Sequence, residues 1–169
     1  MKLIEAMKKV KELQMKADDL KNKVAQYCAI STIETPTYAD QKRQISEWIQ
    51  AHSDILKLVL RLRVAIQKTN LETDVAIEIG GKQVTKTIAE WIHRRRDLAH
   101  NELAIWNKLT DRGIKEGLAN GPSGTPIEVK IVRFYDPSER DNKRDIYTSE
   151  PSIIDARLEV INAITDLIE

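Results

Sequence analysis

The sequence has little of several features, and each shortage excludes a class of protein. A single cysteine, Cys28, excludes an intramolecular disulfide and a cysteine metal cluster within one chain, and it fits a reducing compartment. No run of about 18 apolar residues occurs, and charges recur every few residues from the N-terminus onward. We therefore expect neither export by a signal peptide nor a membrane-spanning helix, and we place the chain in the cytoplasm.

The sequence also has almost no excess of one sign of charge. The formal net charge is +1, which excludes the global basic excess that lets a protein grip nucleic acid non-specifically, although a local basic patch is still allowed. Hydrophobic residues make up 41% of the 169 residues and charged residues 31%, a mix typical of a folded protein with a well-solvated surface. This length favours a single domain over residues 1–169.

The first 70 residues predict a helical hairpin. From Met1 to about Ile30, apolar residues recur at alternating spacings of three and four, which is a heptad seam typical of a coiled coil: Leu3, Ala6, Val10, Leu13, Ala17, Leu20, Val24 and Tyr27. Pro36 interrupts the pattern, and Thr37 can cap a second helix from Tyr38 to about Asn70. The short connector predicts antiparallel neighbours.

The second helix carries more apolar surface than one partner helix needs. One row matches the first seam: Ile45, Trp48, His52, Ile55, Val59, Leu62 and Ile66. A second row lies beside it: Ile49, Leu56, Leu60 and Val64. Two rows indicate contact with a third element or with another subunit, so we expect a homo-oligomer.

Residues 71–169 predict a mixture of short strands and helices. Asp74 to Ile79 alternates apolar and polar residues before Gly80-Gly81, which predicts a β-hairpin. A capping box beginning at Thr87 opens a helix expected to reach Arg112. We expect a loop over 117–126, a strand from Ile127, a charged turn over 136–145, a returning strand over 146–148 and a final helix after Ser149 and Pro151. The predicted fold class is α+β and helix-dominated, with a long antiparallel helical hairpin, a small antiparallel sheet and two further helices.

Three consecutive arginines, Arg94, Arg95 and Arg96, form the strongest candidate site. Successive helical residues point about 100° apart, so at least one arginine must approach the apolar face of its helix. Arg95 lies four residues after Trp91 and three before Leu98, which places it within the apolar stripe. An arginine there requires an acidic partner, an interface or an anionic ligand. The three arginines are therefore candidates for binding a ligand or an anion.

The stretch from Arg95 to His100 also resembles the arginine-x4-histidine motif of HEPN-type ribonucleases. In that family the motif lies on a helix and is completed by dimerisation. The resemblance implies that Arg95 and His100 act on the RNA phosphate and the 2′-hydroxyl. It covers six residues, and Arg96 stands where the family usually has asparagine, aspartate or histidine. A salt-bridged helix face involving Asp97 and Glu102 is the alternative interpretation.

The sequence does not indicate a metal site, a nucleophilic cysteine or a nucleotide-binding motif. His93 and His100 are seven residues apart, too far to share one metal ion without further ligands, and His52 lies within a helical seam. Cys28 lies near a helix end whose dipole disfavours a thiolate. No P-loop, dinucleotide fingerprint or nucleophile elbow occurs. We expect no cofactor and no metal.

Over nearly its whole length the chain resembles a bacterial family of small uncharacterised proteins often labelled septicolysin. The resemblance rests on residues 1–6, on 80–85 with 89–96, and on 149–155. The label implies a pore-forming toxin, but the sequence lacks a long amphipathic β-hairpin and a tryptophan-rich tip. We expect a cytoplasmic homo-oligomer of the interaction or ligand-binding kind, most simply non-enzymatic. Its possible partners are itself, an anionic ligand or RNA, and no membrane. The alternative is a HEPN-like ribonuclease.

Overall fold

The computed structural model describes residues 1–168, and helices make up most of them. The chain groups into two compact units. Unit 1 comprises Met1–Asp74, Thr87–Ala89 and the described residues from Leu158 onward, while unit 2 comprises Val75–Lys86 and Glu90–Arg157. The helix-dominated α+β class predicted from the sequence is confirmed, with a long helical hairpin and two small antiparallel sheets.

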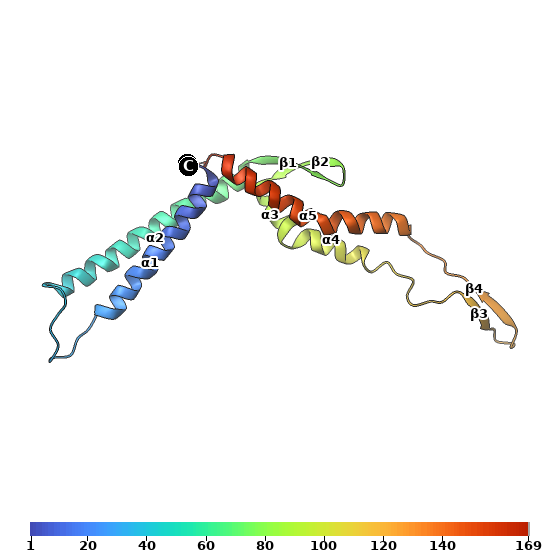
Figure 1. Ribbon diagram of the computed structural model, residues 1–169, viewed down its shortest axis with the longest axis horizontal. Coiled ribbons are helices and arrows are strands. Elements are labelled where there is room, and N and C mark those ends of the chain that lie inside the picture. Colours follow the sequence, from blue (N-terminus) through green and yellow to red (C-terminus); the bar gives the residue numbers. More distant parts are fainter. Residues whose placement is uncertain (169) are drawn as a thin grey trace. The chain divides into compact units, whose positions relative to one another are not determined.

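Unit 1 is built on the antiparallel helices α1 (Leu3–Tyr27) and α2 (Gln41–Glu72), which lie side by side (Figure 1). The heptad seam of α1 is covered along its whole length, and the first apolar row of α2 faces it. At the centre, Val10 and Leu13 pack against Val59. Burying each such side chain stabilises the fold by about 1.5–3 kcal/mol. The two helices therefore pair through the faces on which apolar residues recur every three or four positions.

The second helix, predicted to begin at Tyr38, begins at Gln41, after the connector between α1 and α2. Asp40 is the N-cap, because its carboxylate accepts a hydrogen bond of 3.0 Å from the Arg43 backbone N–H. Tyr38 instead packs edge-on against Tyr27 and Trp48, with ring centroids 5.4 and 5.3 Å away. This aromatic cluster fixes the chain reversal.

The two ends of the chain meet in unit 1. The backbone N–H of Leu3 donates to the Thr165 carbonyl at 2.9 Å, and the N–H of Ile88 donates to the Thr73 carbonyl at 3.0 Å. In each case the first residue of a helix binds the residue that follows the end of another helix. The buried Thr69 hydroxyl accepts from the Ile168 N–H at 2.9 Å. Helix starts and helix ends thereby satisfy one another's unpaired backbone groups.

The first segment of unit 2 is the predicted hairpin, β1 (Asp74–Ile79) and β2 (Lys82–Thr87), without its outer residues Asp74 and Thr87, which belong to unit 1. Gly80 and Gly81 have φ of 58° and 77°, the left-handed values that a tight hairpin turn requires. Gly80 also lies close to the Ile146 side chain. A Cβ at this position would lie 2.8 Å from the Ile146 Cδ1 atom, so the turn rests directly on the helix that carries Ile146.

The helix predicted to run from Thr87 to Arg112 is shorter and is interrupted. It consists of α3 (Ile88–His93), a π-helical turn η1 (Arg94–Leu98) and α4 (Ala99–Trp106). A π turn adds one residue to the local repeat, so the buried face passes from Trp91 to Ala99 instead of to Leu98, which is 45% exposed. The position predicted for Leu98 in the stripe is therefore wrong. Beyond α4, Arg112 and Gly113 both have positive φ.

The strand predicted from Ile127 is confirmed but ends at Val129, and the returning strand predicted at 146–148 is wrong. The strands are β3 (Gly117–Asn120) and β4 (Pro126–Val129), paired antiparallel with Gly117 opposite Val129. The predicted loop thus contains a strand, and Gly121 and Gly124 lie in the hairpin turn. Residues 146–148 belong to helix α5 (Pro137–Ile164), which begins far earlier than expected.

Helix α5 begins where a charged turn was predicted. Pro137 occupies its first position, where a missing N–H is harmless, and the Asp136 carboxylate accepts from the Ser138 N–H at 2.9 Å. Pro151, the predicted start, lies inside the helix. On either side of Pro151, the side-chain hydroxyls of Thr148, Ser149 and Ser152 donate to carbonyls of the preceding helical turn.

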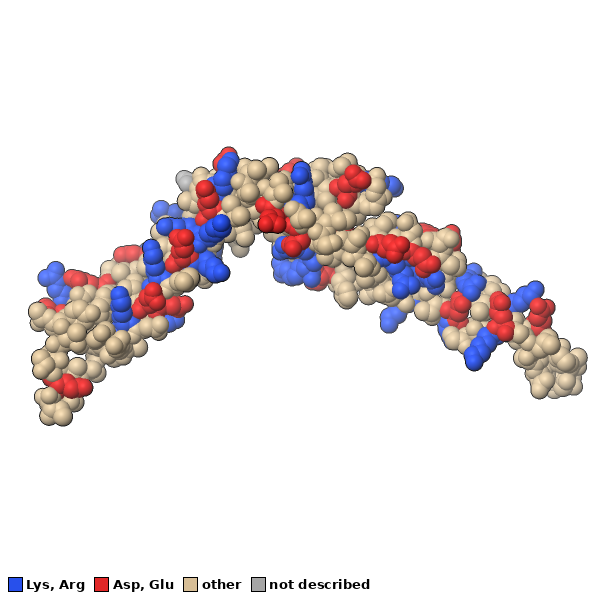
Figure 2. Space-filling view, viewed as in Figure 1, with Lys and Arg blue, Asp and Glu red and all other residues tan. Residues whose placement is uncertain are grey.

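Charges of both signs are interspersed along the visible face of the α1–α2 hairpin (Figure 2). Several are helix neighbours that pair with one another, such as Lys21 with Asp18 at 2.6 Å. Such exposed pairs contribute little stability, and their main effect is to keep the surface solvated. The mixed surface agrees with the net charge of +1.

Candidate functional site

A pocket in unit 2 joins the hairpin, the arginine cluster and α5, and we name it the Arg94 pocket. Its cavity is about 310 Å³. Its lining residues come from three stretches of chain: Ile79, Gly80, Lys82, Val84 and Lys86; Trp91 and Arg94; and Asn142, Lys143, Ile146, Tyr147 and Glu150. Four of these residues are cationic and one is a carboxylate, in a chain whose charges otherwise nearly balance.

Arg94 is the best-anchored member of the arginine cluster. Its Nε and Nη2 donate to the two carboxylate oxygens of Glu150 at 2.7 and 2.8 Å. The exposed fractions of the two side chains are 18% and 3%, so water screens this bidentate pair little. Hydrogen bonding to Glu150 raises the pKa of the Arg94 guanidinium above its ordinary value. Arg94 is thus held rigidly, with its third nitrogen 3.6 Å from Glu102.

The floor of the pocket is aromatic. Trp91 is fully buried, and its indole N–H donates to the Val75 carbonyl at 2.9 Å, which ties α3 to β1. The Tyr147 ring lies with its centroid 5.9 Å from the Arg94 guanidinium carbon. The Tyr147 hydroxyl is protonated at neutral pH, as a tyrosine ordinarily is, and can donate a hydrogen bond; burial raises its pKa further.

Three lysines surround this floor. Lys82 and Lys86 lie on β2 at a spacing of four residues, which places both on the face that also carries Val84. Lys143 comes from α5, one helical turn before Tyr147. Within residues 1–168, none of the three lysines makes an ion pair or a side-chain hydrogen bond. Their charges are therefore available to a bound anion.

Pro151 adds a polar group on α5 beside the pocket. A proline has no backbone N–H, so the Tyr147 carbonyl four residues earlier lacks its usual helical donor. Tyr147 and Glu150 both line the cavity. The proline thus interrupts the helix ladder on the turn that carries the two lining residues.

The other candidates of the arginine cluster lie on the surface. Arg95 Nη1 donates to the Asp155 carboxylate at 2.6 Å, but the two side chains are 40% and 68% exposed. Arg96 and His100 are exposed. The prediction that Arg95 lies within the apolar stripe is wrong, because the π turn shifts the buried face and gives the inward position to Arg94. Of the two carboxylates in the predicted salt-bridged helix face, Glu102 lies 3.6 Å from the Arg94 Nη1 atom.

Five residues of the pocket were not predicted from the sequence: Lys82, Lys86, Lys143, Tyr147 and Glu150. Part of the signal was present. Lys82, Val84 and Lys86 share the two-residue period of a strand, and Lys143, Tyr147 and Glu150 share the spacing of one helix face. The second pattern was hidden because residues 136–148 were assigned to a turn and a strand.

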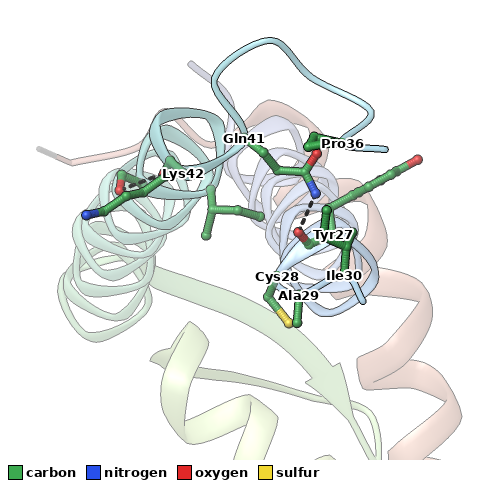
Figure 3. Close-up of a pocket in the computed structure, with 9 residues that line it drawn as sticks. Tyr27, Cys28, Ala29, Ile30, Pro36, Gln41 and Lys42 are labelled. Carbon is green, nitrogen blue, oxygen red and sulfur yellow. Dashed lines mark hydrogen bonds between the residues drawn. The ribbon is translucent and has the colours of Figure 1, made fainter. Parts of the chain in front are cut away.

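A second cavity of about 380 Å³ lies where α1 meets the connector (Figure 3). Its wall is Tyr27, Cys28 and Ile30, and the Gln41 amide closes it by donating to the Tyr27 carbonyl at 2.8 Å. The Lys42 ammonium extends away from the Cys28 end of the cavity (Figure 3). This cavity follows from the chain reversal, and it places no converging charged groups.

Among residues 1–168, no three His, Cys, Asp or Glu side chains are close enough together to hold a metal ion. In the same part of the chain, no helix has the length and apolar character required to cross a membrane.

Comparison with known proteins gives one informative result. No protein-family model matches the chain, and a search of curated protein sequences gives no match. The chain is similar in structure to a functionally unknown conserved protein from Corynebacterium diphtheriae, whose crystal structure aligns with a TM-score of 0.58 and 20% sequence identity over 99% of each chain. At this identity the likeness shows a shared fold alone.

Proposed function

We propose that this protein binds a small anionic ligand in the Arg94 pocket and acts as a homo-oligomer rather than as an enzyme. The observation that carries the proposal is the set of three unpaired lysines around a protonated tyrosine, with the one carboxylate of the lining already held by Arg94. Lysine ammonium groups bind phosphate and carboxylate as point charges, and each such contact contributes about 1.5–3 kcal/mol.

The ligand class follows from the lining. The cationic rim suits a phosphate or polycarboxylate group, while Ile146 and the Tyr147 ring offer an apolar surface to the remainder of the molecule. A small phosphate ester fits both halves. The cytoplasm, where such metabolites are abundant, is the compartment that we propose, and the single cysteine agrees with it.

Isothermal titration with pyrophosphate and with adenosine monophosphate tests this proposal. We expect saturable binding that weakens with added salt, and a loss of roughly tenfold in affinity for Lys82→Gln and for Lys143→Gln, since one charge-assisted contact contributes about 1.4 kcal/mol or more. Lys16→Gln is the matched control, because Lys16 is exposed on α1 in unit 1. Absence of saturable binding, or equal weakening by the control, would refute the site.

The homo-oligomer is supported by the second apolar row of α2. Helix α1 covers the first row and leaves the second in water, with Ile49, Leu56, Leu60 and Val64 each about half exposed. A contiguous apolar row of this kind is rare on monomers and typical of interfaces. The septicolysin resemblance stays a prediction alongside this proposal.

The alternative function is a ribonuclease that uses Arg95 and His100. Arg95 in the π turn and His100 in the first turn of α4 lie close along the chain, and both are exposed. A phosphate would have to displace Asp155 from Arg95. Cleavage of single-stranded RNA that His100→Ala abolishes, in a variant with unchanged melting temperature, would establish the alternative over the binding proposal.

A further inference from the structure

The exposed row of α2 is longer than four residues and has an internal order. Positions three or four residues apart along one face carry Ile49, Ser53, Leu56, Leu60, Val64, Gln67 and Leu71. The five apolar members are between 47% and 64% exposed, and the two polar members are exposed as well. The row extends over about 33 Å of helix.

The order reads the same in both directions about Leu60. Ile49 and Leu71 are equally far from Leu60, as are Ser53 and Gln67, and as are Leu56 and Val64. In an antiparallel pair of identical helices related by a twofold axis, residue i meets residue j while j meets i. Because apolar positions mirror apolar ones and a polar position mirrors a polar one, this row is complementary to its own antiparallel copy.

We propose that α2 pairs with α2 of a second copy of this chain, antiparallel, with the twofold axis at Leu60. This inference rests on the proposed homo-oligomer and gives it a geometry. Leu60 meets Leu60 at the axis, Leu56 meets Val64 on either side, and the Ser53 hydroxyl faces the Gln67 amide. Neither polar side chain makes a hydrogen bond to another described residue of its own chain.

The polar pair specifies this register over its neighbours. Sliding one helix by a heptad would set Ser53 or Gln67 against leucine, which would leave a hydroxyl or an amide without a partner in an apolar contact. A parallel pairing would set Ser53 against Ser53 and Gln67 against Gln67. Both arrangements set polar against polar, so the two are separated by which cysteine pairs cross-link.

The area suits a stable dimer. Five half-exposed apolar side chains leave roughly 500 Å² of apolar surface per copy in water, at about 100 Å² each. A standard interface buries about 800 Å² per partner, and the polar members and the flanking side chains of the helix supply the remainder. Near the axis, the Lys57 ammonium pairs with the Asp54 carboxylate of its own chain at 3.0 Å, so the flank of the row carries both signs of charge.

Cysteine cross-linking tests the geometry. In a Cys28→Ser background, a short bismaleimide should link Leu60→Cys to itself. Ser53→Cys and Gln67→Cys should each stay unlinked alone and give a linked product when the two proteins are mixed, because 14 helical residues separate the two positions by about 21 Å. Lys16→Cys, exposed on α1, is the control and should stay unlinked.

Light scattering distinguishes a wrong pairing geometry from the absence of any oligomer. Twice the 19.3 kDa mass of one chain is expected at micromolar concentration, and Leu60→Glu should return it to one chain with an unchanged helical signal. Met15→Glu, on an equally exposed apolar residue of α1, should leave the dimer intact. Self-linking by Ser53→Cys, or no product from the mixture, overturns the antiparallel geometry while an oligomer stands. A single-chain mass at every concentration overturns both.

Discussion

At the scale of single residues, two neighbouring arginines show how burial decides the contribution of an ion pair. Arg94 and Glu150 form a bidentate pair from which water is largely excluded, and Arg95 and Asp155 form a single contact on the surface. Removing one partner of the first pair leaves a charge that cannot return to water without disrupting the fold. Removing one partner of the second leaves a charge that is already solvated.

We therefore predict that Arg94→Ala lowers the free energy of unfolding by roughly 3 kcal/mol and that Arg95→Ala lowers it by about 0.5 kcal/mol or less. Urea denaturation of both variants measures the difference. Glu150→Ala should match Arg94→Ala, and the double variant should lose less than the two single losses added together. Equal losses for Arg94→Ala and Arg95→Ala would contradict this account.

The sequence did not predict that Arg94, and not Arg95, is the arginine that points inward. A regular helix of about 3.6 residues per turn places Arg95 between Trp91 and Leu98 on one face. The π turn at Arg94–Leu98 inserts one residue into that repeat. Such a turn is stabilised by its surroundings, here by the reach of Arg94 to Glu150, which lies 56 residues away in the chain. The spacing of residues around Arg94 therefore cannot predict the π turn.

At the scale of elements, the β3–β4 hairpin depends on a clasp formed by the segments that flank it. Arg133 donates to both carboxylate oxygens of Asp111 at 2.7 and 2.8 Å, and the Tyr135 hydroxyl donates to the same carboxylate at 3.2 Å. The segment after α4 is thereby joined to the segment before α5. The hydrogen bonds from Arg133 lower the pKa of the Asp111 carboxyl below its ordinary value.

This clasp gives a pH prediction. Because the folded state lowers the pKa of Asp111, its contribution to stability is present above the unfolded value of 3.8 and is lost as the pH falls through the lowered one. We expect the amide hydrogen of Ile131, which donates to the Glu116 carboxylate at 3.1 Å, to exchange faster in Asp111→Asn at neutral pH, while the amide hydrogens of α1 are unchanged. Equal protection in variant and parent would show that the clasp does not hold this segment.

Elements with a strong period were predictable, and those defined by turns were not. The seam of α1 and the Gly80-Gly81 hairpin followed from spacing alone, because burial and positive φ select residues locally. The start of α5 was missed because Pro137 and mixed charges are typical both of a turn and of a first helical turn. The strand at Gly117–Asn120 was missed because its glycine-rich sequence has no strand propensity, and its ladder with β4 supplies the order.

At the scale of the whole molecule, the fold depends more on pattern than on identity. The structural similarity to the Corynebacterium diphtheriae protein extends over 99% of both chains although only 20% of the residues are identical. Binary patterning of the kind seen in the α1–α2 hairpin survives such change, since any apolar residue of suitable size keeps a seam buried. This is also why the sequence predicted the fold class and the second apolar row of α2, while the Arg94 pocket required the structure.

The backbone contact between Leu3 and Thr165 has a kinetic consequence. It closes a loop of nearly the entire chain, whereas the α1–α2 hairpin closes only its short connector. Contacts between distant residues are slow to form because loop closure costs entropy before it is rewarded. We expect Val59→Ala, in the hairpin core, to slow refolding. Ile161→Ala, buried where the chain ends meet, should speed unfolding by at least about tenfold and leave the refolding rate nearly unchanged in stopped-flow measurements. The reverse pattern would place the meeting of the two chain ends at the start of folding.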